Sequence, residues 1–572
     1  MSSILEEALT AYRAGDLTRI TAEIAPRAEG EVSPDSQLCL VIAQAFAKQD
    51  AGVKAAQWYI RAALPLGAKG AALFVLAANL FRGAGHLKPA LAAARQAVAF
   101  APNNGPALEV HRKCLRVALA FDEMAESNRL LLDRLRSGDQ AANAVDTPHF
   151  HVCWCADEAI NVRVRDAHGP APFTAESRAA RRAFPHRFGD RIRVGYLSND
   201  FFSAHATMML LSGVLRRHDR NRFDITLFCH TPPDLVAKDD GLRHSLGTIV
   251  PVGHLGPEDA CRLIREHGID ILVDLKGHTK GARIDILNAG AAPIQASWLG
   301  FPGSGSAIDC DYLIGDPVVT PAGSAPFYHE KLCRLPESYQ PNNSLDRPRP
   351  SAADRQALGL PEDRFIFSSF NSSWKISPET FALWSRILKE TGDSLLWTMV
   401  TEPLAQENLR NAMAKAGVDP ARILFAGPEP YERHLARAQA ADLHLDPFPC
   451  NGHTTTSDML WAGVPVVTMK GSHFASRVSE SLLRALDMPE LVADSPDGYV
   501  DLCTSLAENP QALLSLRSKL SANRGRAALF DTERFTRHLE DGYCLMVERA
   551  KAGLEPDHID VPARPVRREP FI

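Results

Sequence analysis

The sequence predicts an α/β protein with an all-α N-terminal arm: a superhelix of paired helices, then two Rossmann-like domains. Three observations predict this. The first 140 residues nearly lack strand-like runs and repeat with a period of 34; from residue 191 short apolar runs alternate with helical stretches; and a proline-rich break at 337–353 divides the alternating part. The chain has 572 residues, 45% of them apolar and 23% charged, so several buried cores are expected.

The arm, residues 1–140, is rich in Ala, Leu and Arg. Alanines recur 34 residues apart in three pairs: Ala43 and Ala77, Ala56 and Ala90, Ala63 and Ala97. This is the period of the tetratricopeptide helix–turn–helix, in which small residues let paired helices approach closely. We expect about three to four degenerate repeats, including 4–30 and 105–139. An ordinary helical bundle is the alternative.

Residues 141–190 form a connector with prolines at 148, 170, 172 and 185. Its segment HFHVCWC (149–155) places His149, His151, Cys153 and Cys155 at alternate positions. A tetrahedral zinc site usually takes ligand pairs from two separated segments, so the alternation favours a half-buried strand over a metal site.

The α/β half begins with the strand-like runs RIRVGYLS (191–198), FDITLFCH (223–230) and IDILVDL (269–275). A second set follows the proline-rich break: RFIFSSF (364–370), DSLLWTMV (393–400), RILFAG (422–427), LHLDP (443–447) and VPVVTM (464–469). Strands that alternate with helices predict parallel sheets, whose ligands bind at the carboxyl ends of the strands. We therefore expect one domain at 191–345, another at 346–555, and a tail at 556–572.

Composition argues against several classes of partner. The chain has 63 basic and 68 acidic residues, a net charge of −5, which lacks the basic excess of a nucleic-acid or anionic-membrane binder. No run approaches the roughly 18–20 apolar residues of a membrane span, and the N-terminus does not resemble a signal peptide. Eleven cysteines, an odd number, suit reduced thiols. We expect a cytoplasmic protein.

The densest polar cluster is DPFPCNGHTTTSD (446–458), between a strand and a helix. Asn451 and Gly452 form a turn, and His453 with the three following threonines opens the helix. Free N–H groups and the helix dipole attract an anion there, and Thr hydroxyls add donors. Asp458, one turn further on, can accept hydrogen bonds from a ribose diol. A plain N-cap needs fewer polar residues, so the cluster predicts phosphate binding.

Other polar loops also follow predicted strands. NSSWKISP (371–378) places Lys375 at the strand-end edge that carries the threonine cluster, where an ammonium can neutralise a diphosphate. NDFFSAHATMM (199–209) holds His205, and KGHTKGAR (276–283) holds His278. The loop 297–312 has glycines at 300, 303 and 305, which admit a ligand or serve a tight turn. The GxGxxG, Walker, HExxH and GxSxG patterns are absent.

Four segments carry a resemblance to a known family: WLGFPGSGSA (298–307), NSSWKISP, PCNGHTTTSDMLWAGVPVVTM (449–469) and HFASRVSESLL (473–483). Behind tetratricopeptide-like repeats, they resemble the protein O-GlcNAc transferases, and the short arm and DxxxxHAT loop are similar to bacterial members. The resemblance implies a GT-B fold, UDP-GlcNAc as donor, inversion at the anomeric carbon, and serine or threonine hydroxyls of proteins as acceptors. It implies no metal or other cofactor.

The resemblance also implies roles for individual residues. Lys375 matches the lysine that stabilises the departing UDP, and His205 matches a histidine near the acceptor. The remaining matches concern the donor: Thr454 and Thr455 for the phosphates, Asp458 for the ribose, His434 and Arg437 beside the uridine, Cys450, Asn451, Gly452 and His453 in the turn facing sugar and ribose, Leu299 and Gly300 against the GlcNAc, and His278 in the related loop.

Ser372 departs from the family pattern, which often has glutamine there, and the arm is far shorter than in animal members. The acceptor's proton has three candidate destinations: His205, whose reference pKa is about 6.5, a donor phosphate, or a water chain. Alternative functions remain. They are a protein O-fucosyltransferase using GDP-fucose, an N-glucosyltransferase acting on asparagine, and a repeat scaffold with a non-catalytic transferase fold.

Overall fold

The computed structural model describes residues 3–30, 35–565, 567 and 569–571. The chain divides into two compact units, 1–146 with 400–415, and 147–399 with 416–572. A helical N-terminal region precedes two parallel sheets with their helices, so the predicted architecture is confirmed.

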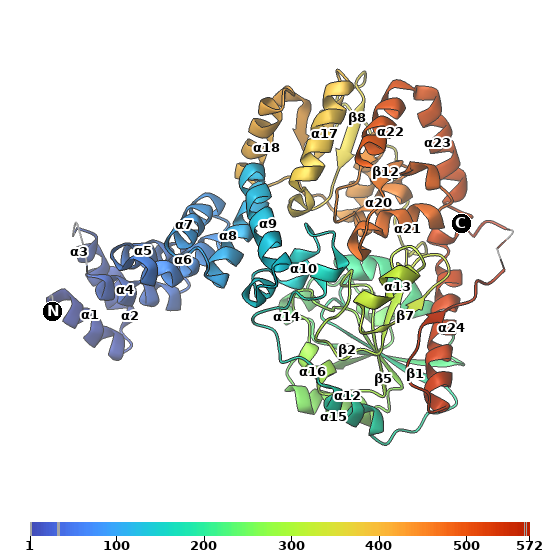
Figure 1. Ribbon diagram of the computed structural model, residues 1–572, viewed down its shortest axis with the longest axis horizontal. Helices are drawn as coiled ribbons and strands as arrows, with labels where there is room; N and C mark the ends of the chain where they lie inside the picture. The colour runs from blue at the N-terminus through green and yellow to red at the C-terminus, as the bar shows by residue number, and fades with distance from the viewer. Residues whose placement is uncertain (1–2, 31–34, 566, 568, 572) are drawn as a thin grey trace. The chain divides into compact units, whose positions relative to one another are not determined.

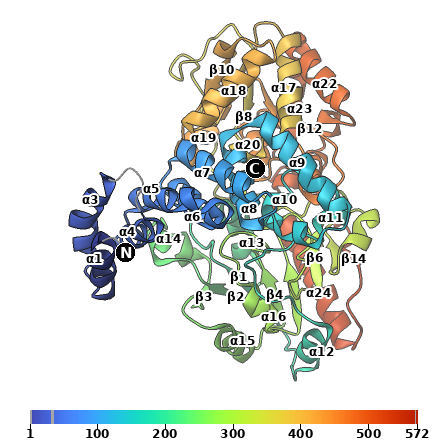
Figure 2. The ribbon, with the colours of Figure 1, turned by 60° about the vertical axis from the view of Figure 1, so that its left-hand side comes forward.

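Between residues 36 and 136, each helix of the first unit packs against the next (Figure 2). The helices of this unit are α1 (Ser3–Arg13), α2 (Leu17–Arg19), α3 (Ala25–Glu29), α4 (Ser36–Lys48), α5 (Gly52–Ala63), α6 (Ala71–Gly83), α7 (Leu87–Phe100), α8 (Gly105–Ala118), α9 (Phe121–Arg136) and α18 (Pro403–Lys415). Helix α6 begins 35 residues after α4, and α8 begins 34 after α6. The repeated alanines, among them Ala43, Ala56, Ala77 and Ala90, are fully buried. Small side chains therefore lie where the paired helices meet.

One stretch of the arm, Gly52–Gly83, has the length and apolar composition of a membrane-crossing helix, with a mean hydropathy of 1.6 in its most apolar window. Gly67 interrupts it with φ 54° and ψ −131°, which no helix accommodates. Helices α5 and α6 then pack against each other. The stretch is thus a helical hairpin of the arm.

The second unit contains a parallel sheet of eight strands in the order β14-β7-β6-β5-β4-β1-β2-β3 (Figure 1). The strands are β1 (Ile192–Ser198), β2 (Phe223–Cys229), β3 (Thr248–Pro251), β4 (Ile271–Asp274), β5 (Ile294–Ser297), β6 (Tyr312–Gly315), β7 (Lys331–Arg334) and β14 (Ile559–Asp560). Helices α13 (Ala206–Arg217), α14 (Pro233–Val236), α15 (Pro257–Glu266) and α16 (Ile284–Asn288) connect them.

A parallel sheet of six strands follows, in the order β10-β9-β8-β11-β12-β13. Its strands are β8 (Ile366–Ser369), β9 (Leu395–Thr398), β10 (Ile423–Phe425), β11 (Leu443–Leu445), β12 (Val466–Met469) and β13 (Val492–Ala493). Its helices include α17 (Pro378–Glu390), α19 (Tyr431–Ala438), α20 (Thr454–Ala462), α21 (Val478–Ala485), α22 (Pro496–Glu508) and α23 (Pro510–Asn523).

The last long helix, α24 (Thr532–Lys551), returns to the first sheet (Figure 1). The Tyr543 hydroxyl lies 3.0 Å from that of Tyr196 in β1, and strand β14 pairs with β7. The chain therefore crosses back before residue 532, whereas the sequence places everything up to 555 in the second domain. The pattern of α24 shows that it is helical but carries no information about which sheet it covers.

The connector contains helices α10 (Pro148–His151), α11 (Glu158–Asn161) and α12 (Ala175–Ala183). The prediction of a strand at 149–155 is therefore wrong. Proline is well suited to the first position of a helix, and Pro148 occupies it in α10. The Cys155 N–H then donates to the His151 carbonyl, which continues the helical turn.

Candidate functional site

Both sheets of the second unit have a topological switch point, where ligands of open α/β folds bind. In the first sheet β1 lies between β2 and β4, so the loops after β1 and β4 are neighbours. In the second sheet β8 lies between β9 and β11, which brings together the loops after β8 and β11. We call these places the β1/β4 edge and the β8/β11 edge.

Lys375 and the predicted phosphate cluster meet at the β8/β11 edge. Lys375 ends a short turn after β8, and its Nζ donates a 2.6 Å hydrogen bond to the carbonyl of Asn451, 76 residues away. Within the same loop, Ser372 is exposed. The ammonium is thus held at the turn that leads into α20.

The turn before α20 is built on the buried carboxylate of Asp446. It accepts a 2.6 Å hydrogen bond from the Gly452 N–H and a 2.7 Å bond from the Thr468 hydroxyl. Burial raises the pKa of Asp446 to about 7. A Cβ on Gly452 would lie 2.4 Å from Thr456 Oγ1, so only glycine fits. These contacts fix the turn that carries Cys450 to His453.

Helix α20 begins without a side-chain cap, because His453 at its N-cap position makes no capping hydrogen bond. Thr454 and Thr455 are half-buried in its first turn, whereas Thr456 is buried with its hydroxyl 2.8 Å from that of Ser479. The first two threonines and the dipole of the helix can therefore serve an anion. Thr456 is structural.

Asp458 lies further along α20 and is 5% exposed. Its Oδ1 accepts a 2.7 Å hydrogen bond from the Tyr431 hydroxyl and lies 3.0 Å from the Arg347 guanidinium. Burial raises the pKa of Asp458, while Arg347 lowers it. The carboxylate is thus oriented through one oxygen. Tyr431 and Arg347 were not found from the sequence, because Arg347 lies in a proline-rich linker that gave no signal of a site.

His434 and Arg437 form a pair on α19. Arg437 donates to the Gly427 carbonyl at 2.6 Å and to His434 Nδ1 at 2.9 Å. Because Nδ1 accepts, the ring proton belongs on Nε2. Burial lowers the pKa of His434 to about 4, so the ring is neutral near pH 7. The pair therefore offers one Nε2–H donor beside the packed ring of Phe370.

At the β1/β4 edge the charged groups pair with one another. Lys276 Nζ lies 2.8 Å from both carboxylate oxygens of Asp200, and both side chains are about 6% exposed. His205 Nε2 lies 3.4 Å from Asp200 Oδ1, while Nδ1 accepts the Thr207 N–H at 3.2 Å and caps α13. Burial lowers the pKa of His205. The neutral ring thus has no free lone pair, which disfavours His205 among the three candidate acceptors of the proton in this arrangement.

The glycine loop after β5 has a constrained backbone. Leu299 adopts φ 75°, and a Cβ on Gly300 would lie 2.1 Å from the Leu275 carbonyl oxygen. Phe301 packs in one apolar cluster with Cys450, so this loop meets the turn before α20. His278 Nε2 lies 3.0 Å from the Ser306 carbonyl, and burial lowers its pKa to about 4. Its ring therefore fastens the loop.

The connector contributes His149, which the sequence did not single out as a site residue. Its ring centre lies 5.5 Å from that of Trp374 and 6.4 Å from that of Phe301, and its buried Nδ1 has no hydrogen-bond partner among the described residues. Burial lowers its pKa to about 4, and Lys375 and His453 add to this. The sequence predicts this segment as a strand or as a set of metal ligands. Neither interpretation indicates that the ring of His149 lies beside Lys375.

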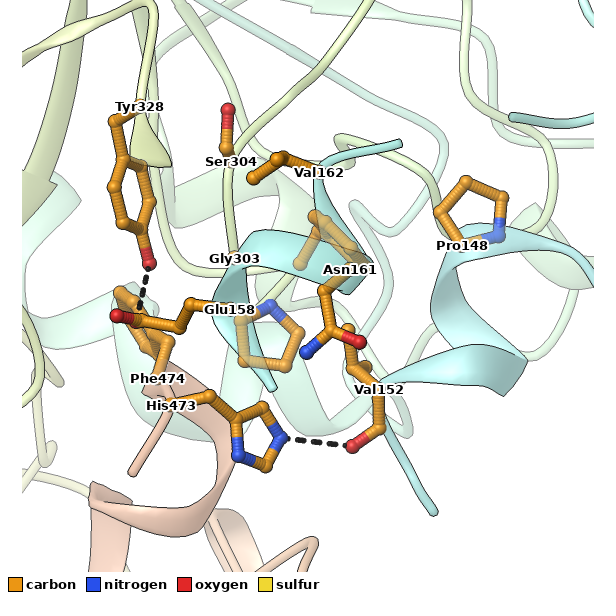
Figure 3. Close-up of a pocket in the computed structure, with 12 residues that line it drawn as sticks. Pro148, Val152, Glu158, Asn161, Val162, Gly303, Ser304, Tyr328, His473 and Phe474 are labelled. Carbon is orange, nitrogen blue, oxygen red and sulfur yellow. Dashed lines mark hydrogen bonds between the residues drawn. The ribbon is translucent and has the colours of Figure 1, made fainter. Parts of the chain in front are cut away.

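The connector is fastened to both sheets around a small cavity (Figure 3). His473 Nε2 lies 2.9 Å from the Val152 carbonyl, and Glu158 accepts from the Tyr328 hydroxyl at 3.3 Å and from Ser324 at 2.7 Å. These contacts hold His149 and the cysteines after it against the site.

The DCD segment is part of an ion-pair cluster. Arg181 lies 2.8 Å from both Asp309 and Asp311 and is almost fully buried. In the described part of the chain, no group of three or more His, Cys, Asp or Glu side chains is arranged to hold a metal ion. These two aspartates therefore anchor α12.

The chain is similar to several known proteins. A model of the family described as glycosyl transferase family 41 matches residues 173–343 and 348–539. A probable UDP-N-acetylglucosamine–peptide N-acetylglucosaminyltransferase SEC of Arabidopsis thaliana is 35% identical over 378 residues, 65% of this chain and 38% of its own length. A UDP-N-acetylglucosamine–peptide N-acetylglucosaminyltransferase of Caenorhabditis elegans is 28% identical over 483 residues, 65% of this chain and 42% of its own.

A solved structure of an O-GlcNAc transferase mutant from Thermobaculum terrenum is also similar. It has a TM-score of 0.64 and 26% sequence identity, and the match covers 96% of this chain and 98% of that one. The chain spans about two fifths of the length of the two curated relatives.

Proposed function

The chain belongs to glycosyl transferase family 41, and we propose that it moves N-acetylglucosamine from UDP-GlcNAc to serine or threonine hydroxyls of proteins, with inversion. One observation carries the proposal. At the switch point of the second sheet, Lys375 is held by the Asn451 carbonyl beside the uncapped start of α20. An ammonium beside a helix N-terminus at a switch point supports the binding of a nucleoside diphosphate there.

The donor's parts have separate partners in this proposal. Thr454, Thr455 and the helix N-terminus bind the diphosphate. Asp458, oriented by Tyr431 and Arg347, accepts from the ribose hydroxyls. The His434 Nε2–H donates to a uracil oxygen. In this account the turn at 450–453 and the loop at Leu299 and Gly300 enclose the sugar.

In the transfer step, the acceptor oxygen bonds to the anomeric carbon while the bond from that carbon to the β-phosphate oxygen breaks. The bond pair leaves with UDP, so negative charge grows on the phosphate. Lys375 and the α20 dipole stabilise that charge. The acceptor's proton passes to a donor phosphate oxygen or to water, because both His205 nitrogens already face protein groups.

The acceptor and the setting are also proposed. A protein segment lies along the concave face of the helical arm, the usual binding surface of stacked helix pairs. The reaction takes place in the cytoplasm, without nucleic-acid or membrane partners.

Two measurements test the activity. UDP should raise the melting temperature while GDP should not, because a ligand that binds only the folded state stabilises it. Mass spectrometry of co-expressed proteins should find HexNAc on serine or threonine. Stabilisation by GDP with deoxyhexose adducts would support the fucosyltransferase instead, hexose on asparagine the N-glucosyltransferase, and no adduct with no nucleotide effect the scaffold.

Metal removal should leave the rate unchanged, since Lys375 and the α20 N-terminus supply the positive charge that a divalent ion supplies elsewhere. The measurement is turnover in excess EDTA with and without added Mg²⁺ or Mn²⁺. Loss in EDTA with recovery on addition of either ion would refute metal independence.

A further inference from the structure

Two thiols from distant parts of the sequence meet beside the proposed donor site. Cys153 follows α10 in the connector, and Cys450 lies in the turn before α20. Both are buried, and they share one apolar cluster with Phe301 and Ala475. The Cys153 thiol donates a 3.1 Å hydrogen bond to the His149 carbonyl, and hydrogen bonding from Cys153 stabilises the thiolate form of Cys450. The two side chains are therefore neighbours within this cluster.

A common scaffold holds the two segments together. The residue before Cys153, Val152, offers its carbonyl to His473 Nε2 at 2.9 Å. The residue after Cys450, Asn451, donates its N–H to the Ala475 carbonyl at 2.9 Å. Both cysteines are therefore tied to the same short stretch, 473–475, and their separation does not depend on a mobile loop.

Cys450 also differs chemically from the buried thiols of Cys114 and Cys333. Burial raises the pKa of Cys114 to about 11 and that of Cys333 to about 12. The pKa of Cys450 is instead lowered by the Cys153 hydrogen bond, the Lys375 ammonium and the His453 ring, against the effect of burial. The thiolate is the form that attacks a peroxide. Cys450 is thus suited to be oxidised first, with Cys153 as its resolving partner.

We propose that Cys153 and Cys450 are a peroxide-sensitive thiol pair that closes into a disulfide and blocks the donor site. The Cys450 thiolate attacks one oxygen of hydrogen peroxide, the O–O bond breaks, and a sulfenic acid and hydroxide form; a proton converts the hydroxide to water. The Cys153 sulfur then attacks the sulfenic sulfur, its proton leaves with the hydroxyl group as a second water, and the S–S bond forms. Two thiols thereby supply the two electrons that reduce one peroxide to two waters.

The expected consequence follows from the position of Cys450. Its neighbour Asn451 holds Lys375 through the 2.6 Å hydrogen bond. A covalent bond from Cys450 to the connector constrains this turn. UDP-GlcNAc affinity should fall, and dithiothreitol should restore it. The effect on transfer rests on the proposed function, whereas formation of the disulfide does not.

The test uses the full chain, treated with increasing hydrogen peroxide, blocked with iodoacetamide and digested without reduction. Mass spectrometry should find a peptide pair joined through Cys153 and Cys450, and calorimetry should show weaker UDP binding that dithiothreitol reverses. Cys155→Ala is the matched control: it changes a neighbouring buried cysteine of the same segment and should still form the link. Cys153→Ala should keep UDP affinity in reductant and lose reversible inactivation.

Two results would overturn the inference. One is a peroxide dose that weakens UDP binding reversibly without a Cys153–Cys450 link. The other is equal reversible inactivation of Cys153→Ala. Should that variant fail to fold, peptide mapping of the unaltered chain decides alone. Absence of transfer in reductant would contradict the proposed function, and the mapping result would still decide the disulfide.

Discussion

The β1/β4 edge and the β8/β11 edge have similar topology, but they differ in whether their lysine is paired with a carboxylate. At the β1/β4 edge, Lys276 is buried against Asp200, and His205 faces the same carboxylate. At the β8/β11 edge, Lys375 is held by a backbone carbonyl, and no carboxylate is paired with it among the described contacts. The comparison teaches that position in a fold does not fix function: the first edge neutralises its own charges, and the second retains positive charge for an anion.

The largest expected effect on stability is at the β1/β4 edge. Lys276→Met leaves the Asp200 carboxylate buried and unpaired, and should lower the free energy of unfolding by about 3–5 kcal/mol. Chemical denaturation measures it. Lys280→Met, in the same loop but exposed, should change it by less than about 0.5 kcal/mol. Equal values for the two variants would show that the buried pair is not a stability element.

The next largest effect concerns ligand binding at the β8/β11 edge. Asp458→Ala removes the proposed ribose acceptor and should weaken UDP by about 1–3 kcal/mol in calorimetry. A melting curve establishes that the variant is folded, because Arg347 loses its ion-pair partner. Asp497→Ala, on the exposed start of α22, is the control and should bind UDP normally. Unchanged affinity in the first variant would remove Asp458 from the donor site.

The smallest effect is expected at His205, which caps α13. Asn also caps helices well, so His205→Asn should keep the pH profile of kcat/KM, with turnover within about tenfold. A general base contributes roughly 10²–10⁴-fold to the rate. If turnover fell by that much and the acidic limb of the pH profile also disappeared, His205 would be the base.

The pH dependence of the free energy of unfolding provides a second test of His205. Burial lowers its pKa, so the folded chain binds its proton less readily than the unfolded chain does. The free energy of unfolding therefore falls as the pH drops below about 6.5, the ordinary histidine value. His205→Asn should reduce that loss, which denaturation at a series of pH values measures. An identical slope would contradict the burial effect.

Local pattern predicted much of the fold. The eight strands expected in the two domains are all present, because helical stretches separate the apolar runs that form them. Strands such as β6 and β7, four residues each, were not predicted, because no α-helix separates β5, β6 and β7. The return of α24 and β14 to the first sheet could not be predicted, since it depends on tertiary contacts such as Tyr543 with Tyr196.

The site residues can be divided in the same way, into those that the local sequence pattern predicts and those that depend on tertiary contacts. Lys375 and the turn at 450–453 were identified because consecutive polar residues followed strands, and the structure brings them together. Lys276 lies in a loop that was noted only for His278, and Arg347 lies in a linker. Their importance comes from partners 76 and 111 residues away, Asp200 and Asp458. A single sequence does not reveal such pairs.

The most direct test of the β8/β11 edge as the catalytic phosphate site compares the donor affinity and the turnover of Lys375→Met. Donor affinity by calorimetry and turnover with saturating UDP-GlcNAc are measured on the same preparation. The account predicts that kcat falls by about 10²–10³-fold, while UDP-GlcNAc affinity changes by less than about tenfold, because charge on the phosphate grows in the transition state. A retained rate, or affinity and turnover that fall equally, would contradict it.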